Sequence, residues 1–362
     1  MKNRVLTSLL AAVLAAGLLA GCGSQPAAET AEPASTEEAA EAPAAAEETA
    51  EEASSAGEAA EDSQEFPSEE AGPDLNLGPL LDEAVPLAGA PALSSVLVPV
   101  ASGTAVSDNA SSSMDYSNAR DGYVMVKWLA GGTPKLKVLI KGPSGTTYQY
   151  NLRSDGQYDT FPLSDGSGSY SVGVYKNISG SQYATILTAD VNAQLVDEFA
   201  PFLRPNQYVS FSENSAAVAK AAELCQGASD NLDKVSRVYS FVVSSLTYDK
   251  EKAQTVQSGY LPDVDQILST KKGICFDYAA LMSAMLRSQG VPVKLVVGYT
   301  SGAYHAWINV YSETEGWIDG KIYFDGTQWK LMDPTFASSG KSSDSVMQYI
   351  GNGANYTVKY LY

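Results

Sequence analysis

The distribution of charge along the chain confines its folded part to the region after about residue 100. Between Arg4 and Arg120 the sequence contains twenty Asp and Glu but no Lys or Arg. Most of this stretch consists of Ala, Glu, Pro, Ser and Thr, with very few aromatic residues. Such a segment cannot bury enough apolar surface to offset the entropy cost of ordering its backbone. We therefore predict a disordered acidic linker over residues 23–100.

The net charge of −19 belongs to this linker rather than to the folded part. From Arg120 onward, 22 acidic and 21 basic residues nearly cancel. An acidic segment that binds a basic partner is the competing interpretation, but it would need aromatic anchors that the linker lacks. The sequence has no basic patch, so we expect no binding to nucleic acid. About 260 residues remain after the linker, which is enough for two domains of ordinary size.

The first 22 residues have the features of an export signal. A basic start is followed by an apolar run and then by small residues before Cys22. The apolar run is too short to span a membrane. The sequence LAGC (19–22) resembles the bacterial lipoprotein box, and this resemblance implies that Cys22 carries the lipid of the mature protein. A plain secretory signal is the alternative. We expect a cell-envelope protein that is lipid-anchored to the outer face of a bacterial membrane.

Residues 101–196 have the pattern of a β-sandwich. Short runs of alternating apolar and polar residues are separated by turns rich in Gly, Pro, Asp and Ser. Strands of this length and spacing predict an antiparallel sandwich of immunoglobulin-like type. No cluster of reactive residues stands out, so a spacer or positioning role is favoured over ligand binding. The runs are YVMVKWL (123–129), KLKVLIKG (135–142), TTYQYNL (146–152), GSYSVGVYK (168–176) and YATILTADVNAQL (183–195).

After Asp197 the apolar residues recur at the spacing of helices. In residues 233–246 they repeat every three or four positions, which predicts one buried stripe on a helix. We expect another helix at 216–225 and a short one at 263–269, capped by Asp263. Cys225 ends the first of these helices and is expected to be buried as a small apolar side chain. A disulfide between Cys225 and a second cysteine is the alternative, because exported proteins can form them.

Cys275 and the only histidine, His305, lie where two predicted elements begin. Cys275 precedes FDYAALMSAMLRSQG, whose apolar spacing predicts a helix that is capped by Gly290. At a helix N-terminus, unpaired amides and the macrodipole favour a thiolate. Gly273, two residues earlier, is expected to leave room for a substrate backbone. His305 opens a strand, HAWINVY, after a turn.

Asp333 ends a further predicted strand and is followed by a proline. Taken singly, the three residues have simpler explanations: a buried cysteine, a satisfied polar histidine and an Asp-Pro turn. Together, Cys275, His305 and Asp333 have the types and the order of a nucleophile, a base and an orienting acid.

These stretches resemble the catalytic core of the transglutaminase-like superfamily. The similarity rests on GICFDYAALMSAMLRSQGVPVKLVVGY, HAWINVY and WKLMDPTF, in that order and at that spacing. The resemblance implies an α+β class chain with a papain-like transglutaminase core over residues 197–362. It also implies a triad of Cys275, His305 and Asp333. The superfamily includes amide crosslinkers, cysteine peptidases, peptide deglycosylating enzymes and inactive relatives, so the reaction stays open.

The sequence departs from animal transglutaminases upstream of the cysteine. Those enzymes place a tryptophan there as a transition-state donor, and this chain has none between Trp128 and Trp307. Tyr248 resembles an aromatic residue found there in bacterial relatives, so Tyr248 and Trp307 are candidates for the oxyanion site or the pocket. A buried aromatic residue that ends a helix is an equally good explanation of Tyr248. The backbone amide of Cys275 is the other candidate oxyanion donor.

We expect no cofactor and no metal. The calcium sites of animal transglutaminases are not evident, and one histidine with two distant cysteines does not supply a zinc site. The predicted activity is attack of Cys275 on peptide or glutamine amides through a thioester, followed by hydrolysis or transfer to an amine. Expected substrates are extracellular proteins or peptidoglycan peptides. The alternative is a catalytically silent scaffold or a peptide- or glycan-binding lipoprotein with the same fold.

Overall fold

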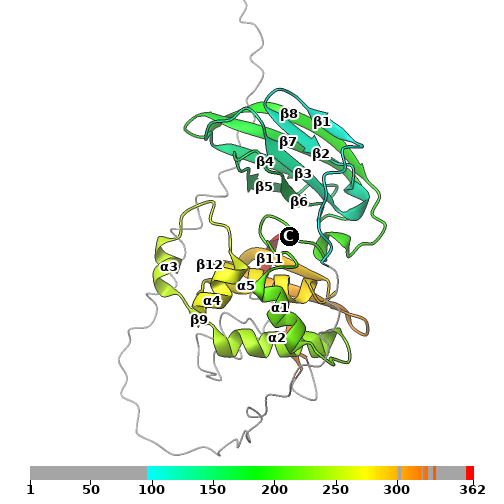
Figure 1. Cartoon of the computed structure of the whole chain (residues 1–362), viewed down its shortest axis with the longest axis vertical. Helices are drawn as coiled ribbons and strands as arrows, with labels where there is room; N and C mark the ends of the chain where they lie inside the picture. Colours follow the sequence, from blue (N-terminus) through cyan, green and yellow to red (C-terminus); the bar gives the residue numbers. More distant parts are fainter. Residues whose placement is uncertain (1–95, 301–302, 320, 325–328, 332–355) are drawn as a thin grey trace, which may run out of the picture. The chain divides into compact units, whose positions relative to one another are not determined.

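The computed structural model describes residues 96–300, 303–319, 321–324, 329–331 and 356–362 (Figure 1). The export signal with Cys22, nearly all of the acidic linker, and Asp333 lie outside the described residues. Within the described part, no helix has both the length and the apolar character needed to cross a membrane.

Residues 106–193 form two four-stranded antiparallel sheets. The strand orders are β1-β2-β3-β6 and β5-β4-β7-β8, and apolar residues of both sheets join one buried core. All five predicted runs form strands, whereas an immunoglobulin-like character of this region stays a prediction. The strands are β1 (Val106–Asp108), β2 (Ser112–Asp115), β3 (Tyr123–Trp128), β4 (Leu136–Lys141), β5 (Thr147–Asn151), β6 (Asp159–Pro162), β7 (Gly168–Ser179) and β8 (Gln182–Ala193).

Strand β2 is buried although its sequence, SSMD, is largely polar. It lies between β1 and β3, and its polar side chains find partners there. The Ser112 hydroxyl donates to the carbonyl of Lys127 at 3.0 Å. The Asp115 carboxylate accepts from the amides of Gly103 at 2.7 Å and Ser117 at 2.9 Å. Alternation of apolar residues could not have predicted such a strand, because hydrogen bonds rather than apolar contacts satisfy it.

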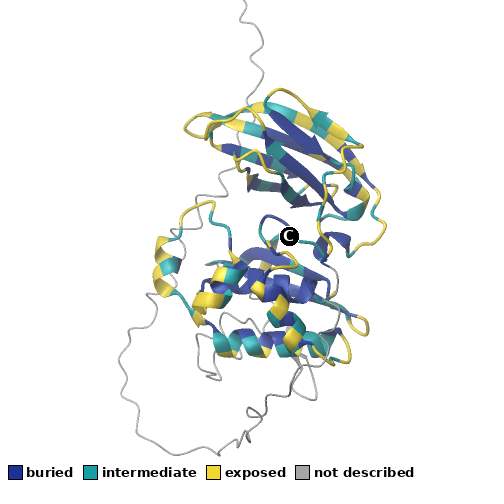
Figure 2. Ribbon diagram, viewed as in Figure 1, coloured by how far each residue is buried: buried dark blue, intermediate teal, exposed yellow. Residues whose placement is uncertain are grey.

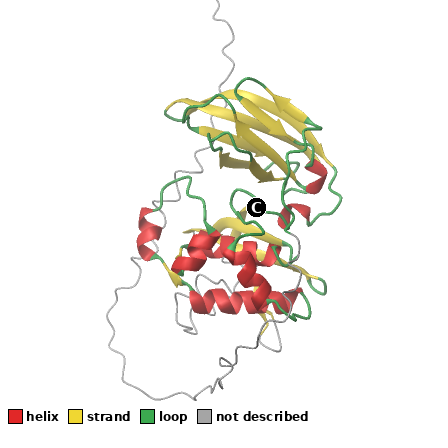
Figure 3. Ribbon diagram, viewed as in Figure 1, coloured by secondary structure: helices red, strands yellow, loops and turns green. Residues whose placement is uncertain are grey.

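The second region, residues 197–362, contains five α-helices in its described part. Four of them, α1, α2, α4 and α5, lie where the sequence predicted helices, and Figure 3 shows them in red. The Asp263 carboxylate caps α4 by accepting from the amides of Asp265 and Gln266, as predicted. Cys225 ends α1 and is buried, also as predicted. The helices are α1 (Ala216–Leu224), α2 (Asn231–Ser245), α3 (Lys250–Thr255), α4 (Val264–Thr270) and α5 (Cys275–Arg287). 3-10 turns precede them at Ala119–Asp121, between β2 and β3, and at Ala200–Phe202, after β8.

An antiparallel sheet of order β13-β12-β11-β16 packs against α5. Helices α1, α2 and α4 also contact α5, so every residue of this helix from Asp277 to Arg287 is buried (Figure 2). Two short pairs complete the region: β9 with β10 in parallel, and β14 with β15 in antiparallel. The strands are β9 (Thr247–Tyr248), β10 (Lys272–Gly273), β11 (Val293–Thr300), β12 (Ala303–Ser312), β13 (Gly316–Ile318), β14 (Lys321–Phe324), β15 (Trp329–Leu331) and β16 (Tyr356–Leu361).

Arg287 ends α5 as a buried guanidinium that binds backbone carbonyls. It donates to the carbonyl of Val293 at 3.0 and 2.7 Å, to that of Arg204 at 2.9 Å and to the backbone oxygen of Tyr362 at 2.6 Å. Burial lowers the pKa of Arg287 to about 9, so the side chain is still charged at neutral pH. This one side chain therefore ties the cysteine helix to β11 and to the residue after β16.

Candidate active site

Cys275 is the first residue of α5, as the sequence predicted. Ile274 occupies the N-cap with an extended backbone, and its side chain offers no acceptor to the helix. The carboxylate of Asp277, at the third helical position, makes the other bond of a capping box by accepting from the Ile274 amide at 2.9 Å. Cys275 and Phe276 are half-buried, whereas the helix from Asp277 onward is buried, so the cysteine lies at the accessible end of the helix. Both Cys275 and Cys225 are free thiols in the structure.

His305 lies on β12, directly opposite Gly298 on β11. The imidazole is 7% exposed and is stacked on Trp307, with ring centroids 6.2 Å apart and planes 21° apart. Trp307 in turn meets Tyr356 edge to face at 5.2 Å. Gly298 cannot carry a side chain here, because a Cβ would overlap the carbonyl oxygen of Thr357. The glycine thus lets β16 approach the strand pair beside the histidine.

Tyr304, the residue before His305, is near the cysteine. Side chains alternate along a strand, so Tyr304 lies on the β12 face opposite to that of His305 and Trp307. Burial, then neighbouring tyrosines and the Cys275 thiol, raise the pKa of Tyr304. Its ring also meets that of Tyr299 on β11, at 5.5 Å between centroids. The sequence prediction missed Tyr304, although its place beside the only histidine was a usable signal.

Two of the three predicted triad residues lie in the described part: Cys275 is the first residue of α5 and His305 lies on β12, and these two elements pack against each other. The imidazole lies on the β12 face opposite to that of Tyr304, so an encounter of the thiol with the imidazole stays a prediction. Asp333 lies beyond the described end of β15, so its place relative to His305 is not described. The triad as a unit stays a prediction.

Tyr248 and Trp307, the two predicted pocket residues, lie on different elements. Tyr248 is on β9, where it pairs in parallel register with Gly273, two residues before the cysteine. Its half-buried ring packs against the core. Trp307 is 4% exposed and lies against His305. Both residues are close in the fold to one of the two described triad members, and their chemical roles stay predictions.

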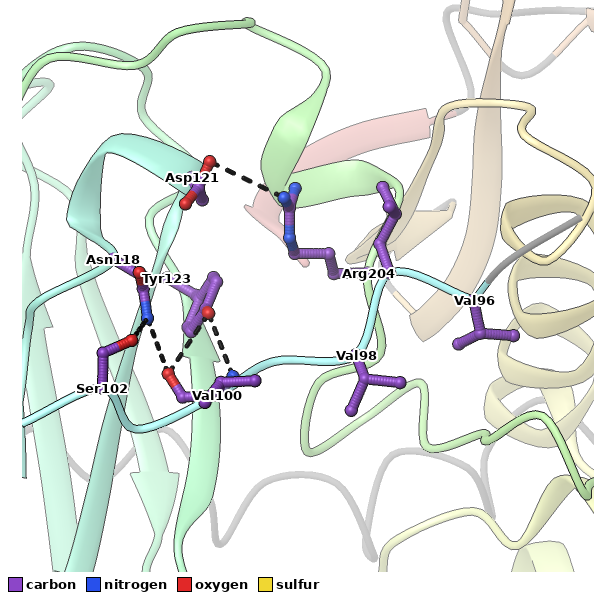
Figure 4. Close-up of a pocket in the computed structure, with 9 residues that line it drawn as sticks. Val96, Val98, Val100, Ser102, Asn118, Asp121, Tyr123 and Arg204 are labelled. Carbon is purple, nitrogen blue, oxygen red and sulfur yellow. Dashed lines mark hydrogen bonds and ion pairs between the residues drawn. The ribbon is translucent and has the colours of Figure 1, made fainter.

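A shallow pocket of the described part lies away from these residues (Figure 4). Its lining includes Val96, Val98, Val100, Tyr123 and Arg204. The Tyr123 hydroxyl accepts from the amide of Val100 at 3.0 Å, and Arg204 pairs with Asp121 at 3.7 Å. The polar groups drawn there are already engaged with the protein, and none of the candidate catalytic residues lines the pocket. Among the described residues, no group of three or more His, Cys, Asp or Glu could hold a metal ion.

Comparison with known proteins identifies the domain that carries the cysteine. Residues 218–334 match the family model of the transglutaminase-like superfamily. YebA of Bacillus subtilis is 33% identical over 118 residues, which cover 27% of this chain and 16% of that protein. Kyphoscoliosis peptidase of Mus musculus is 30% identical over 117 residues, covering 32% of this chain and 17% of that protein.

A third relative is named for acyl transfer. Protein-glutamine gamma-glutamyltransferase of Pseudomonas aeruginosa is 29% identical over 68 residues, covering 15% of this chain and 10% of that protein. The chain spans less than a fifth of the length of each of these relatives. Residues 218–334 thus form a transglutaminase-like domain, and the relatives named for an activity include both a peptidase and a glutamyltransferase.

Proposed function

We propose that this transglutaminase-like domain is a cysteine enzyme that acts on peptide or glutamine amides through a thioester on Cys275. The observation that carries the proposal is the place of Cys275, half-buried at the first residue of a helix that is buried from Asp277 onward. Helix N-termini stabilise anions, and a thiolate is the nucleophilic form of cysteine. The family match over residues 218–334 supports the same class of chemistry.

The reaction proceeds in two halves. The Cys275 thiolate attacks the amide carbonyl carbon, forming a C–S bond and an oxyanion. His305, as imidazolium, gives its proton to the amide nitrogen, the C–N bond breaks, and the amine or ammonia leaves a thioester behind. Water or a lysine amine then attacks the thioester, His305 takes the incoming proton, and the thiolate is released. Asp333 is proposed to hold the imidazole in the required tautomer.

The oxyanion needs hydrogen-bond donors that are in place before the reaction. We propose the backbone amide of Cys275 as one donor, because the first amides of a helix have no intrahelical acceptor. The phenol of Tyr248 is the second candidate, since β9 runs beside Gly273 at the entry to the helix.

The test measures hydrolysis of the thioester and its transfer to an amine in the same experiment. The protein is incubated with a glutamine-containing protein and a tagged primary amine, and products are resolved by mass spectrometry. Tag incorporation that is lost in Cys275→Ala indicates amine transfer, and new fragments without tag indicate peptidase activity. Cys225→Ala is the matched control, because this thiol is buried away from the helix start. Equal behaviour of wild type and Cys275→Ala would favour the silent scaffold.

We also propose that the protein is exported and held at the outer face of a bacterial membrane by lipid on Cys22. The support is the sequence alone: a basic start, a short apolar run and LAGC before a long acidic linker. Extracellular proteins and peptidoglycan peptides would then be the accessible substrates. Expression in a bacterial host tests the anchor, because Cys22→Ser should move the protein from the membrane fraction to the soluble one. Equal partition of both forms would contradict it.

A further inference from the structure

A charge cluster around a buried carboxylate lies next to the start of the cysteine helix. The Asp277 carboxylate, fully buried, accepts from the Lys252 ammonium at 2.6 Å and from the Tyr260 hydroxyl at 2.6 Å. Lys252 also donates to the Tyr260 oxygen at 2.6 Å and lies 4.1 Å from the centre of its ring. With the Ile274 amide, Asp277 therefore has three donors. The sequence prediction used none of these three side chains.

The segment that supplies Lys252 is fastened to the strand before the cysteine. The amide of Thr247 donates to the carbonyl of Lys271, and that of Asp249 donates to the carbonyl of Gly273, both at 2.9 Å. The Asp249 carboxylate then caps α3 by accepting from the Lys252 amide at 2.9 Å. The position of Lys252 is therefore set from the same backbone that leads into Cys275.

Gly273 lets the carboxylate occupy this position. A Cβ on Gly273 would lie 2.6 Å from the Cβ of Asp277, closer than real Cβ contacts. We expected this glycine to leave room for a substrate backbone, and the structure gives it a different role. It makes space for Asp277.

The cluster has an electrostatic consequence for the nucleophile. A carboxylate in the first turn stabilises the helix through its dipole. It also places a negative charge two residues from Cys275, and a like charge disfavours the thiolate. The Lys252 ammonium compensates that charge at contact distance, where little water intervenes. Burial first, and the bond to Asp277 second, raise the pKa of Tyr260, so its phenol stays a donor.

We propose that Lys252 is a positioning residue for the reaction: it neutralises Asp277, so that one carboxylate fixes the entry of α5 without opposing the Cys275 thiolate. Tyr260 is the second donor that holds the carboxylate in place. This inference rests on the proposed function of Cys275, but its main readout, alkylation of the thiol, does not require turnover.

The test uses Lys252→Met in the full chain, with Lys250→Met as the matched control. Lys250 is an exposed lysine on the same helix. The rate of Cys275 alkylation by iodoacetamide is followed from pH 5 to pH 10, and kcat and KM are measured with the tagged amine. Lys252→Met should shift the alkylation profile to higher pH by about one unit and lower kcat by about tenfold, with KM unchanged. Lys250→Met should behave as wild type.

A double variant separates charge compensation from loss of structure. In Lys252→Met/Asp277→Asn the uncompensated carboxylate is gone, so the alkylation profile should return toward that of wild type. Lys252→Arg, which keeps the charge, should also stay near wild type. An unshifted profile in a folded Lys252→Met protein would overturn the proposal, as would a shift that persists unchanged in the double variant. Activity that survives Cys275→Ala would instead refute the proposed function, while leaving the alkylation result interpretable.

Discussion

The backbone amide of Ile274 donates to the carboxylate of Asp277 at 2.9 Å, across the residue proposed as the nucleophile. Ile274 has no polar side chain that could accept from the first-turn amides, and the bond at this helix start runs the other way, from the N-cap amide to a side chain inside the helix. Cys275 is thus enclosed between two residues whose relation is fixed by a hydrogen bond.

The two described thiols should differ strongly in reactivity. Cys225 is 8% exposed, and its burial raises the pKa of its thiol, so little thiolate forms near neutral pH. We expect iodoacetamide to label Cys275 at least about tenfold faster than Cys225 in the native protein, measured by peptide mass spectrometry over time. In urea the two rates should become similar. His305→Ala should slow Cys275 alone, and equal native rates would argue against a reactive cysteine.

Tyr248→Phe tests the predicted oxyanion donor. The substitution keeps the ring that packs on the core and removes only the hydroxyl. If the phenol donates to the oxyanion, kcat should fall by about 10²-fold with little change in KM or melting temperature. Tyr175→Phe in β7 serves as a control for loss of a tyrosine hydroxyl far along the chain. An unchanged kcat would leave Tyr248 as a packing residue.

Arg287→Met should destabilise the second region without touching the proposed chemistry. Arg287 is 3% exposed, and its guanidinium donates to three backbone oxygens, which would lose a donor in a buried environment. We expect the unfolding free energy to fall by about 3 kcal/mol, seen as a lower urea midpoint at constant slope. Arg287→Lys keeps the charge but not the planar guanidinium, so its unfolding free energy should lie between those of wild type and Arg287→Met. Arg120 is exposed, so Arg120→Met should leave the unfolding free energy unchanged. A loss as large as that of Arg287→Met would contradict the stabilising role of the Arg287 guanidinium.

The start of α2 should make stability depend on pH in the acid range. The Asp230 carboxylate accepts from the amide of Asp233 at 2.9 Å, and this bond lowers its pKa below 3.8. Because the folded pKa is the lower one, the stabilisation is complete above 3.8 and is lost as the pH falls through the folded value. Asp230→Ala should therefore cost about 1 kcal/mol at pH 7 and less once the wild-type carboxylate is protonated.

Urea unfolding at several pH values measures this difference. Asp190→Ala, which removes an exposed carboxylate from β8, is the control and should show no such pH-dependent gap. A gap between wild type and Asp230→Ala that persists unchanged at acid pH would show that the cap does not depend on charge.

The helices were predictable because their signals are local. The stripe of α2 and the Asp263 cap of α4 depend on residues within a few positions of each other. Strands β2 and β16 were missed for different reasons. Polar β2 is satisfied by hydrogen bonds to neighbouring segments, and β16 belongs to the sheet only through its pairing with the distant β11.

The candidate site likewise contains residues that local sequence signals could indicate and residues that only tertiary contacts bring together. Cys275 and His305 could be chosen as candidates because each lies near the start of an element whose pattern is visible in the sequence. Cys275 begins α5, whereas β12 begins at Ala303, two residues before the predicted start at His305. Tyr304 and the cluster of Lys252, Tyr260 and Asp277 could not, because only tertiary contacts bring their side chains together. The apolar periodicity of a sequence cannot indicate that Lys252 pairs with Asp277, 25 positions later.

That separation of 25 positions has a consequence for how the chain acquires its structure. Closing a loop of this length costs less entropy than closing a longer one, so this contact can form before pairings between more distant segments. The surroundings of the thiol can therefore assemble in a nascent chain before β16 has been added to the sheet. Completion of the site would then depend on when the later strands join the sheet, because the surroundings of the nucleophile would already be formed.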